Sequence, residues 1–236
     1  MKLQNNTEAQ ISGSIGLLTW KLINNTLIIS GKGAVLDYKS SRSWQAYKNH
    51  IATVIIENGI KSIMQGTFSS YTNLTTINIP KTVRNIEEEA FGYEENVKAI
   101  NVDSNNPVYS SENGVLFDKA KTVLISCSVD KMRDYIIPDS VTSIGDYAFI
   151  ACKLYSITIP SGLISIGQGA FCRCKNLKHI ILHSKTPPII NEIMYKNTFK
   201  EVDKDTCILH IPFGSKNRYA NAEDWKEFKN IQEDTE

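Results

Sequence analysis

Four segments of the chain repeat one pattern of apolar residues in the same register. The stretch IPDSVTSIGDYAF at 137–149 returns as IPSGLISIGQGAF at 159–171. In every copy a Phe follows Thr or Ala, with an Ile five residues earlier and a Val, Leu or Ile eight residues earlier. The aligned phenylalanines are Phe68, Phe91, Phe149 and Phe171. They lie 23 residues apart in the first pair and 22 in the second, and a fixed period of roughly 20–50 residues indicates stacked repeats.

Each copy is long enough for one strand and a compact return segment. A strand that ends in INIP at 77–80 puts Ile77 and Ile79 on one face of the sheet and Thr76 and Asn78 on the other. Pro80 then ends the strand. The V-x-x-I spacing that follows predicts a helical or 3-10 turn. A single unit cannot bury its apolar edge, whereas stacked units can. The repeat therefore predicts a solenoid whose strands form one continuous parallel sheet, about 4.8 Å apart.

The copies resemble the BspA-like class of leucine-rich repeat, whose pattern runs L-x-x-I-x-I-P-x-x-V-x-x-I-(G)-x-x-A-F-x-x-C. One copy matches it at Leu74, Ile77, Ile79, Pro80, Val83, Ile86, Ala90 and Phe91, and another at Ile137, Pro138, Val141, Ile144, Gly145, Ala148, Phe149 and Cys152. The Asn of commoner leucine-rich repeats is replaced by Thr82, Ser140 or Gly162. The resemblance covers residues 13–232. It implies a leucine-rich repeat solenoid: a right-handed coil of β-strand plus turn or 3-10 units, with a parallel sheet on one face.

The segments outside the regular repeats are expected to cap or interrupt the stack. Two strand-like runs flank Asn24-Asn25, which predicts a β-hairpin, and a short helix is expected from Ser43. In the insertion at about 103–134 we expect a turn at Asn113-Gly114 and then a second hairpin, in which the apolar runs GVLF at 114–117 and TVLIS at 122–126 flank a polar turn. A closing helix near the C-terminus is anchored by Tyr219, Trp225 and Phe228. The expected organisation is a disordered remnant at 1–10, an N-terminal hairpin and short-helix cap at 11–53, the repeat stack at 54–212, and a C-terminal helical cap at 213–236.

Composition and charge exclude several classes of protein. The 236 residues carry 26 basic and 25 acidic side chains, a net charge of +1 without a basic cluster, so no nucleic-acid partner is expected. No apolar run approaches the roughly 20 residues of a membrane-spanning helix. The start of the chain has no apolar core typical of an export signal. A mature secreted protein that had lost its signal would look the same.

No arrangement of residues in the sequence indicates catalysis. His179 and His183 are four apart across a strand and its exit, and zinc would need two further ligands. The CRC at 172–174 differs from a C-x-x-C motif, and the EEE at 87–89 is typical of a solvated corner. We therefore expect no enzyme activity, no cofactor and no metal site. Cys152 and Cys174 occupy equivalent repeat positions and are expected to be neighbours. At this spacing they could be free thiols or form a disulfide.

The strand residues that point away from the core form the candidate binding face. Its members are Thr53, Ile55, Thr76, Asn78, Asn101, Ile136, Thr158, His179, Ile181 and His210. Solenoids present such a sheet as an extended binding surface. The competing interpretation is that these side chains are there only because strands favour β-branched residues.

The function that the resemblance implies is non-catalytic recognition. The family is largely bacterial and exposed at the cell surface or secreted, and adhesion to host or neighbouring-cell macromolecules is its best-attested role. The expected partner is a protein or glycan on the sheet face, and the chain is expected to be a monomer that does not span a membrane. The alternatives are a structural spacer or assembly scaffold in a larger cell-envelope complex, and a glycan-processing enzyme, for which the repeats offer no paired carboxylates in a cleft.

Overall fold

The structure is a computed structural model that describes residues 10–35, 43–87, 89–91, 97–127, 133–191 and 198–235. The chain divides into two compact units, one ending at Val108 and the other beginning at Tyr109. Nearly all of the expected disordered remnant at 1–10 lies outside the described residues. Each unit is a β-solenoid with parallel sheets, as the repeat predicts.

The first unit begins with an antiparallel cap. Its strands are β1 (Ile11–Ile15), β2 (Leu18–Ile23) and β3 (Thr26–Gly31). Asn24 and Asn25 both adopt positive φ angles, 46° and 63°, as the two-residue hairpin turn requires, so the predicted hairpin is confirmed. The predicted short helix is a 3-10 segment, η1 (Ser43–His50), whose buried Trp44 donates a hydrogen bond from Nε1 to the Tyr71 hydroxyl at 3.1 Å. Strand β1 was not predicted.

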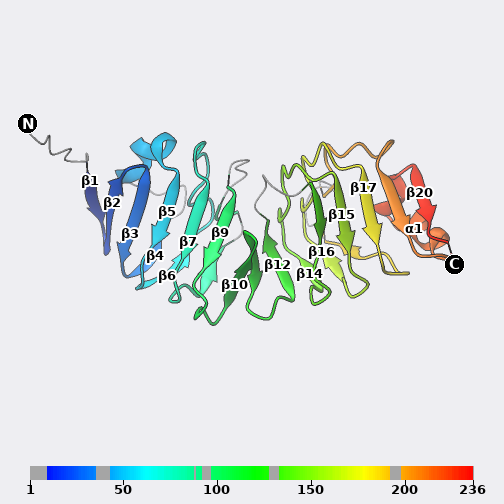
Figure 1. Cartoon of the computed structure of the whole chain (residues 1–236), viewed down its shortest axis with the longest axis horizontal. Helices are drawn as coiled ribbons and strands as arrows, with labels where there is room; N and C mark the ends of the chain where they lie inside the picture. Colours follow the sequence, from blue (N-terminus) through cyan, green and yellow to red (C-terminus); the bar gives the residue numbers. More distant parts are fainter. Residues whose placement is uncertain are drawn as a thin grey trace, which may run out of the picture. The chain divides into compact units, whose positions relative to one another are not determined.

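Parallel strands continue from this cap through the repeats of the first unit. In one sheet of this unit, which we call the wide sheet, β3 is followed by β5 (Thr53–Ile56), β7 (Thr76–Ile79) and β9 (Ala99–Val102), side by side in Figure 1. The other sheet, which we call the narrow sheet, contains β4 (Gly33–Val35), β6 (Ile60–Ile63) and β8 (Asn85–Ile86). The pairing is in register, so that Val54, Ile77 and Ile100 are successive partners and all three are buried.

The second unit has the same two kinds of sheet. Its wide sheet contains β13 (Asp134–Ile136), β15 (Ser156–Ile159), β17 (His179–Leu182), β19 (Ile208–Ile211) and β20 (Asn230–Glu233). Its narrow sheet contains β10 (Tyr109–Glu112), β11 (Val115–Asp118), β12 (Val123–Ser126), β14 (Ser143–Ile144), β16 (Ser165–Ile166) and β18 (Ile189–Ile190). Strands β10 to β12 pair antiparallel and confirm the predicted hairpin insertion.

Two expectations about the repeats were wrong in detail. The last two residues of the V-x-x-I segment form a short strand of the narrow sheet instead of a helical turn. Its main-chain groups pair with the same segment of a neighbouring turn, as in the bond from the Gly167 amide to the Ile144 carbonyl at 2.8 Å. The strands that end at Pro belong to two wide sheets, one in each unit, instead of the single sheet expected, and the insertion contributes its hairpin to the narrow sheet.

The phenylalanines of successive turns are stacked by a main-chain ladder. The amides of Phe68, Phe149 and Phe171 each donate to the carbonyl of the residue directly before the next Phe of the stack, at 3.0, 2.8 and 3.0 Å respectively. The rings of Phe149 and Phe171 lie 5.2 Å apart at 8°, and those of Phe171 and Phe199 lie 5.5 Å apart at 2°. All of these side chains are buried. The ladder fixes the register in which the outward-facing residues also stack.

Two left-handed residues flank the Phe in most turns. Two positions before the Phe stand Gly66, Glu89, Tyr147 and Gly169, and two positions after it stand Ser70, Ala151, Arg173 and Glu201, all with φ between 54° and 65°. Residues other than Gly adopt this region at a cost of roughly 1–2 kcal/mol. At Arg173 the cost is borne because the turn places its amide 2.7 Å from the Lys200 carbonyl of the next turn. The main-chain ladder therefore overrides the local preference.

The five cysteines are free and buried. The Cys174 thiol donates to the Phe149 carbonyl at 3.0 Å, and burial raises its pKa to about 12. The pKa of Cys152 is raised by a hydrogen bond with Cys127 and by burial. Cys152 and Cys174 are neighbours, as expected, and their role is that of small apolar side chains.

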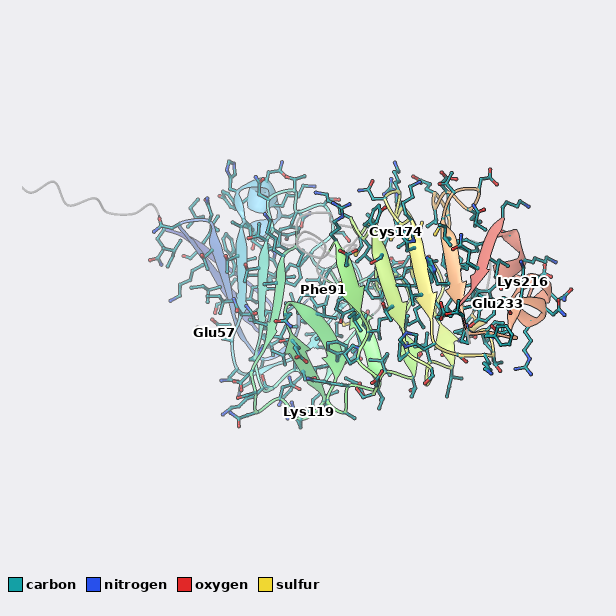
Figure 2. All side chains as sticks on the ribbon, turned by 45° about the vertical axis from the view of Figure 1, so that its right-hand side comes forward. Glu57, Phe91, Lys119, Cys174, Lys216 and Glu233 are labelled. Atoms are coloured by element: carbon teal, nitrogen blue, oxygen red, sulfur yellow. The ribbon has the colours of Figure 1, made fainter. Side chains whose placement is uncertain are left out.

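The C-terminal cap consists of two short helical pieces and a strand. Helix α1 (Lys216–Asn221) and the 3-10 turn η2 (Trp225–Glu227) replace the single closing helix expected, because Ala222 is extended between them. The expected anchors Tyr219, Trp225 and Phe228 are buried. Strand β20, which was not predicted, pairs parallel with β19, and Glu233 near its end accepts from the Lys216 amide at 2.8 Å; both residues are labelled in Figure 2. Among the described residues, no helix has the length and apolar character to cross a membrane.

The phenylalanine stack generates a stability prediction. Replacing Phe149 by Ala should lower the free energy of unfolding by about 3–5 kcal/mol, because a fully buried aromatic ring is lost from between two neighbours. Urea unfolding followed by circular dichroism measures this. Tyr195, outside the phased set, lies outside the described residues, so Phe213, which is 49% exposed, provides the control. Equal losses in Phe149→Ala and Phe213→Ala would contradict the stack.

The left-handed positions generate a second prediction. Arg173→Gly should be more stable to urea than Arg173→Ala by about 1 kcal/mol, because only Gly adopts a φ of 63° without strain. Both variants lose the same exposed ion pair with Glu201, so the difference isolates the backbone. A Gly variant no more stable than the Ala variant would show that the turn is not left-handed in solution.

Candidate binding face

Alternation along each strand of the wide sheets separates core from surface. In β5, Val54 and Ile56 are buried while Thr53 and Ile55 are partly exposed. The same alternation recurs in β7, β15, β17 and β19. The outward residues of paired strands then fall into rows, because the register is the same from strand to strand.

The face of the first unit is polar at one end. One row runs from Thr53 to Thr76, and the other runs from Ile55 through Asn78 to Asn101. The Asn101 Nδ2 donates to the Asn78 Oδ1 at 3.1 Å, so these amides are ordered before any ligand arrives. All five predicted residues of this unit therefore lie together on one sheet.

The face of the second unit carries an apolar row. Ile136, Thr158 and Ile181 are successive partners in β13, β15 and β17, and the row continues to His210 in β19. Ile136 is 73% exposed, a large fraction for an aliphatic side chain on a regular strand. The structure thus joins the exposed Ile136 to the partly exposed Ile181 through one Thr.

A second row in this unit is polar and aromatic. Asp134, Ser156 and His179 are successive partners, and the Ser156 hydroxyl donates to the Asp134 carboxylate at 2.6 Å. The ring of Tyr155, directly before Ser156, contacts two further groups. The Arg133 guanidinium lies 4.6 Å from its centroid, and the His179 ring lies 5.4 Å away on the neighbouring strand. Such a row offers both stacking and hydrogen-bonding groups to a ligand.

The two histidines of the face contact each other. The His179 Nδ1 lies 2.9 Å from the His210 Nε2, with the ring centroids 5.2 Å apart. Burial lowers the pKa of His210 below its ordinary value, His179 lowers it further, and Asp234 acts in the opposite direction. The sequence places His179 beside Ile208 and His210 beside Ile181 and gives no indication of this diagonal contact. The pair that the sequence singled out, His179 with His183, is not brought together in this way.

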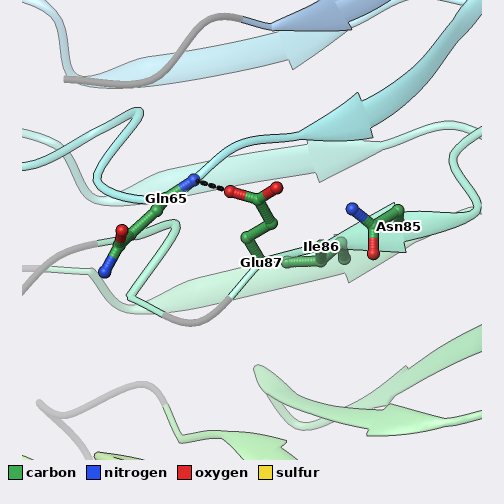
Figure 3. Close-up of a pocket in the computed structure, with 4 residues that line it drawn as sticks. All are labelled: Gln65, Asn85, Ile86 and Glu87. Atoms are coloured by element: carbon green, nitrogen blue, oxygen red, sulfur yellow. Dashed lines mark hydrogen bonds between the residues drawn. The ribbon is translucent and has the colours of Figure 1, made fainter. Parts of the chain in front are cut away.

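The acidic residues at 87–89 do not form a catalytic group among the residues that the structure describes. Glu87 accepts a hydrogen bond from the Gln65 amide at 2.7 Å, at the edge of an open hollow of about 400 Å³ that Asn85 and Ile86 also line (Figure 3). Glu88 lies outside the described residues. Across the part of the chain that the structure describes, no three His, Cys, Asp or Glu side chains are grouped so that they could hold a metal ion.

Thr82 and Ser140 explain how the repeats dispense with the usual Asn. The Thr82 hydroxyl donates to the Ile60 carbonyl at 2.8 Å and accepts from the Gly59 amide at 3.1 Å. The Ser140 hydroxyl donates to the Lys121 carbonyl at 2.9 Å. These hydroxyls link consecutive turns at the position where a buried amide would otherwise do so.

Comparison with protein families identifies the repeat. The model of the BspA type leucine-rich repeat region matches residues 38–116 and 125–214 in six copies, which is more than half of the chain. No curated protein matches the chain significantly.

Several solved structures are similar to the chain. A leucine-rich repeat protein from Eubacterium ventriosum is 20% identical, with 95% of this chain and 85% of that chain covered and a TM-score of 0.41. A leucine-rich cell surface protein from Faecalibacterium prausnitzii is 14% identical, with 98% and 96% covered and a TM-score of 0.46. The pneumococcal vaccine antigen PcpA is 14% identical, with 98% and 100% covered and a TM-score of 0.44.

Proposed function

This chain belongs to the BspA-type leucine-rich repeat family, and we propose that it is a non-catalytic recognition protein of bacteria, exposed at the cell surface or secreted. It binds a protein or glycan of a host or neighbouring cell through the outward faces of its wide sheets. The surface location and the kind of partner follow from the resemblance to the family. The site follows from the physical character of the face.

The observation that carries the proposal is the apolar row of the second unit. Fully burying an Ile gains roughly 1.5–3 kcal/mol over leaving it in water. Ile136 gives up nearly all of that gain at 73% exposure, and it lies beside Thr158 and Ile181 in one line. A partner that covers the row would recover this free energy.

The binding mechanism is the sum of many weak contacts on a face that does not reorganise. Strands β15 and β17 are paired on both sides and the edge strand β13 is paired with β15, and the β-branched side chains of the row have few rotamers to lose. Binding a partner therefore loses little conformational entropy in this protein. Around the row, Ser156, Asp134 and Tyr155 supply polar and stacking contacts that select the partner.

Introducing negative charge into the apolar row tests the proposal. Ile136→Asp together with Ile181→Asp should reduce binding to the partner found in a panel of immobilised extracellular-matrix proteins and glycans by at least about 100-fold, since two apolar contacts are lost. The matched control is Ile164→Asp together with Ile189→Asp. Both of these residues are 63% exposed; Ile164 directly precedes β16 and Ile189 begins β18, and both strands belong to the narrow sheet.

The readouts separate binding from folding. The melting temperature of Ile136→Asp alone should stay within a degree or two of the parent, because the side chain is mostly in water. Equal loss of binding in the control pair would refute the assignment of the face. Absence of any ligand in the panel, together with self-association in size-exclusion chromatography, would favour the spacer or scaffold role over a monomeric receptor.

A further inference from the structure

Two imidazoles from different turns meet on the outer face of the second unit. His179 lies in β17 and His210 in β19, and the two strands pair directly. The His179 Nδ1 and the His210 Nε2 are 2.9 Å apart. Both side chains are partly exposed, so an ion in solution has access to them.

The separation of these nitrogens matches that of two adjacent ligands on one metal ion. Imidazole nitrogens bind ions such as zinc at about 2.0–2.1 Å. Two such ligands at a right angle have their nitrogens about 2.9 Å apart, and a tetrahedral angle would require about 3.4 Å. The pair is therefore spaced for tetragonal coordination, the geometry that nitrogen ligands give to Cu²⁺ and Ni²⁺.

We propose that His179 and His210 form a two-histidine chelate for a divalent transition-metal ion, with Cu²⁺ bound most tightly. The hydrogen bond between the rings is exchanged for two bonds to the ion, and each ring turns away from the line between the two nitrogens so that its lone pair faces the metal. One proton is released if either imidazole was charged, because a ligating nitrogen must be neutral. The proposal stands apart from the recognition role and does not require it.

The surroundings of the pair suit an open site. No third metal ligand is grouped with these histidines among the residues that the structure describes. Water or a side chain of a bound partner would complete the coordination. Tyr155 lies against His179 and limits the rotation of that ring, and the nearby Asp234 carboxylate favours a cation at His210. An ion held here would add a directional contact to the face.

Copper binding by the untagged full chain tests the proposal. Titration with CuCl₂, followed by calorimetry, should give one site of micromolar affinity. Electron paramagnetic resonance should show a tetragonal Cu²⁺ signal with coupling to two nitrogens. His179→Asn and His210→Asn should each weaken binding by about tenfold or more. Zn²⁺ should bind more weakly than Cu²⁺.

The chain supplies its own controls, because it has only four histidines. His183→Asn and His50→Asn should bind Cu²⁺ like the parent, since neither residue belongs to the pair. Equal weakening by all four substitutions, or a parent spectrum without two coupled nitrogens, would overturn the proposal. The spectrum of the parent does not depend on whether a variant folds. A failure here leaves the Ile136 and Ile181 result untouched, so the two proposals fail separately.

Discussion

The main-chain ladder between consecutive turns is the constraint from which the rest of each unit follows. Because the amides of Phe68, Phe149 and Phe171 each donate to the carbonyl of the residue before the next Phe, a turn cannot be rotated or shifted against its neighbour at this point without breaking those bonds. Buried amides without partners are costly, so equivalent positions are held in line. Side chains therefore recur in columns, inside as stacked rings and outside as rows. The arrangement of the outward-facing residues is therefore a consequence of the hydrogen bonds that the buried main chain makes.

Much of the fold could be predicted from the sequence, because the residues that set the register are of kinds with strong structural preferences. Phe149, the prolines that end strands β7, β15 and β19, and the Asn24-Asn25 turn were all placed correctly. Strands β1 and β20 were missed because their residues lie outside the repeat and become strands only through their neighbours. Tyr147 and Ala151 gave no sign of left-handed backbone, since the ladder and not their own preference imposes it.

The candidate binding face also has a part that the sequence predicts and a part that it does not. Its rows could be predicted, because alternation and repeat spacing together say which side chains point outward and which strands are neighbours. The contact between His179 and His210 could not, because it joins residues of two different rows and depends on side-chain rotamers that no pattern encodes. Family membership explains the coil and its surface, whereas the chemistry on that surface belongs to this chain.

The bond between one Phe and the turn after it also makes the coil open to growth by duplication. Each turn meets only the turns on its two sides, so a copied stretch of 22 residues, the distance from Phe149 to Phe171, finds ready-made neighbours wherever it is inserted in phase. The outer surface then lengthens by about 4.8 Å and gains one strand of outward residues, free to vary while the interior stays the same. The reach of such a molecule can thus change in whole steps through gene duplication, without a new core having to be invented.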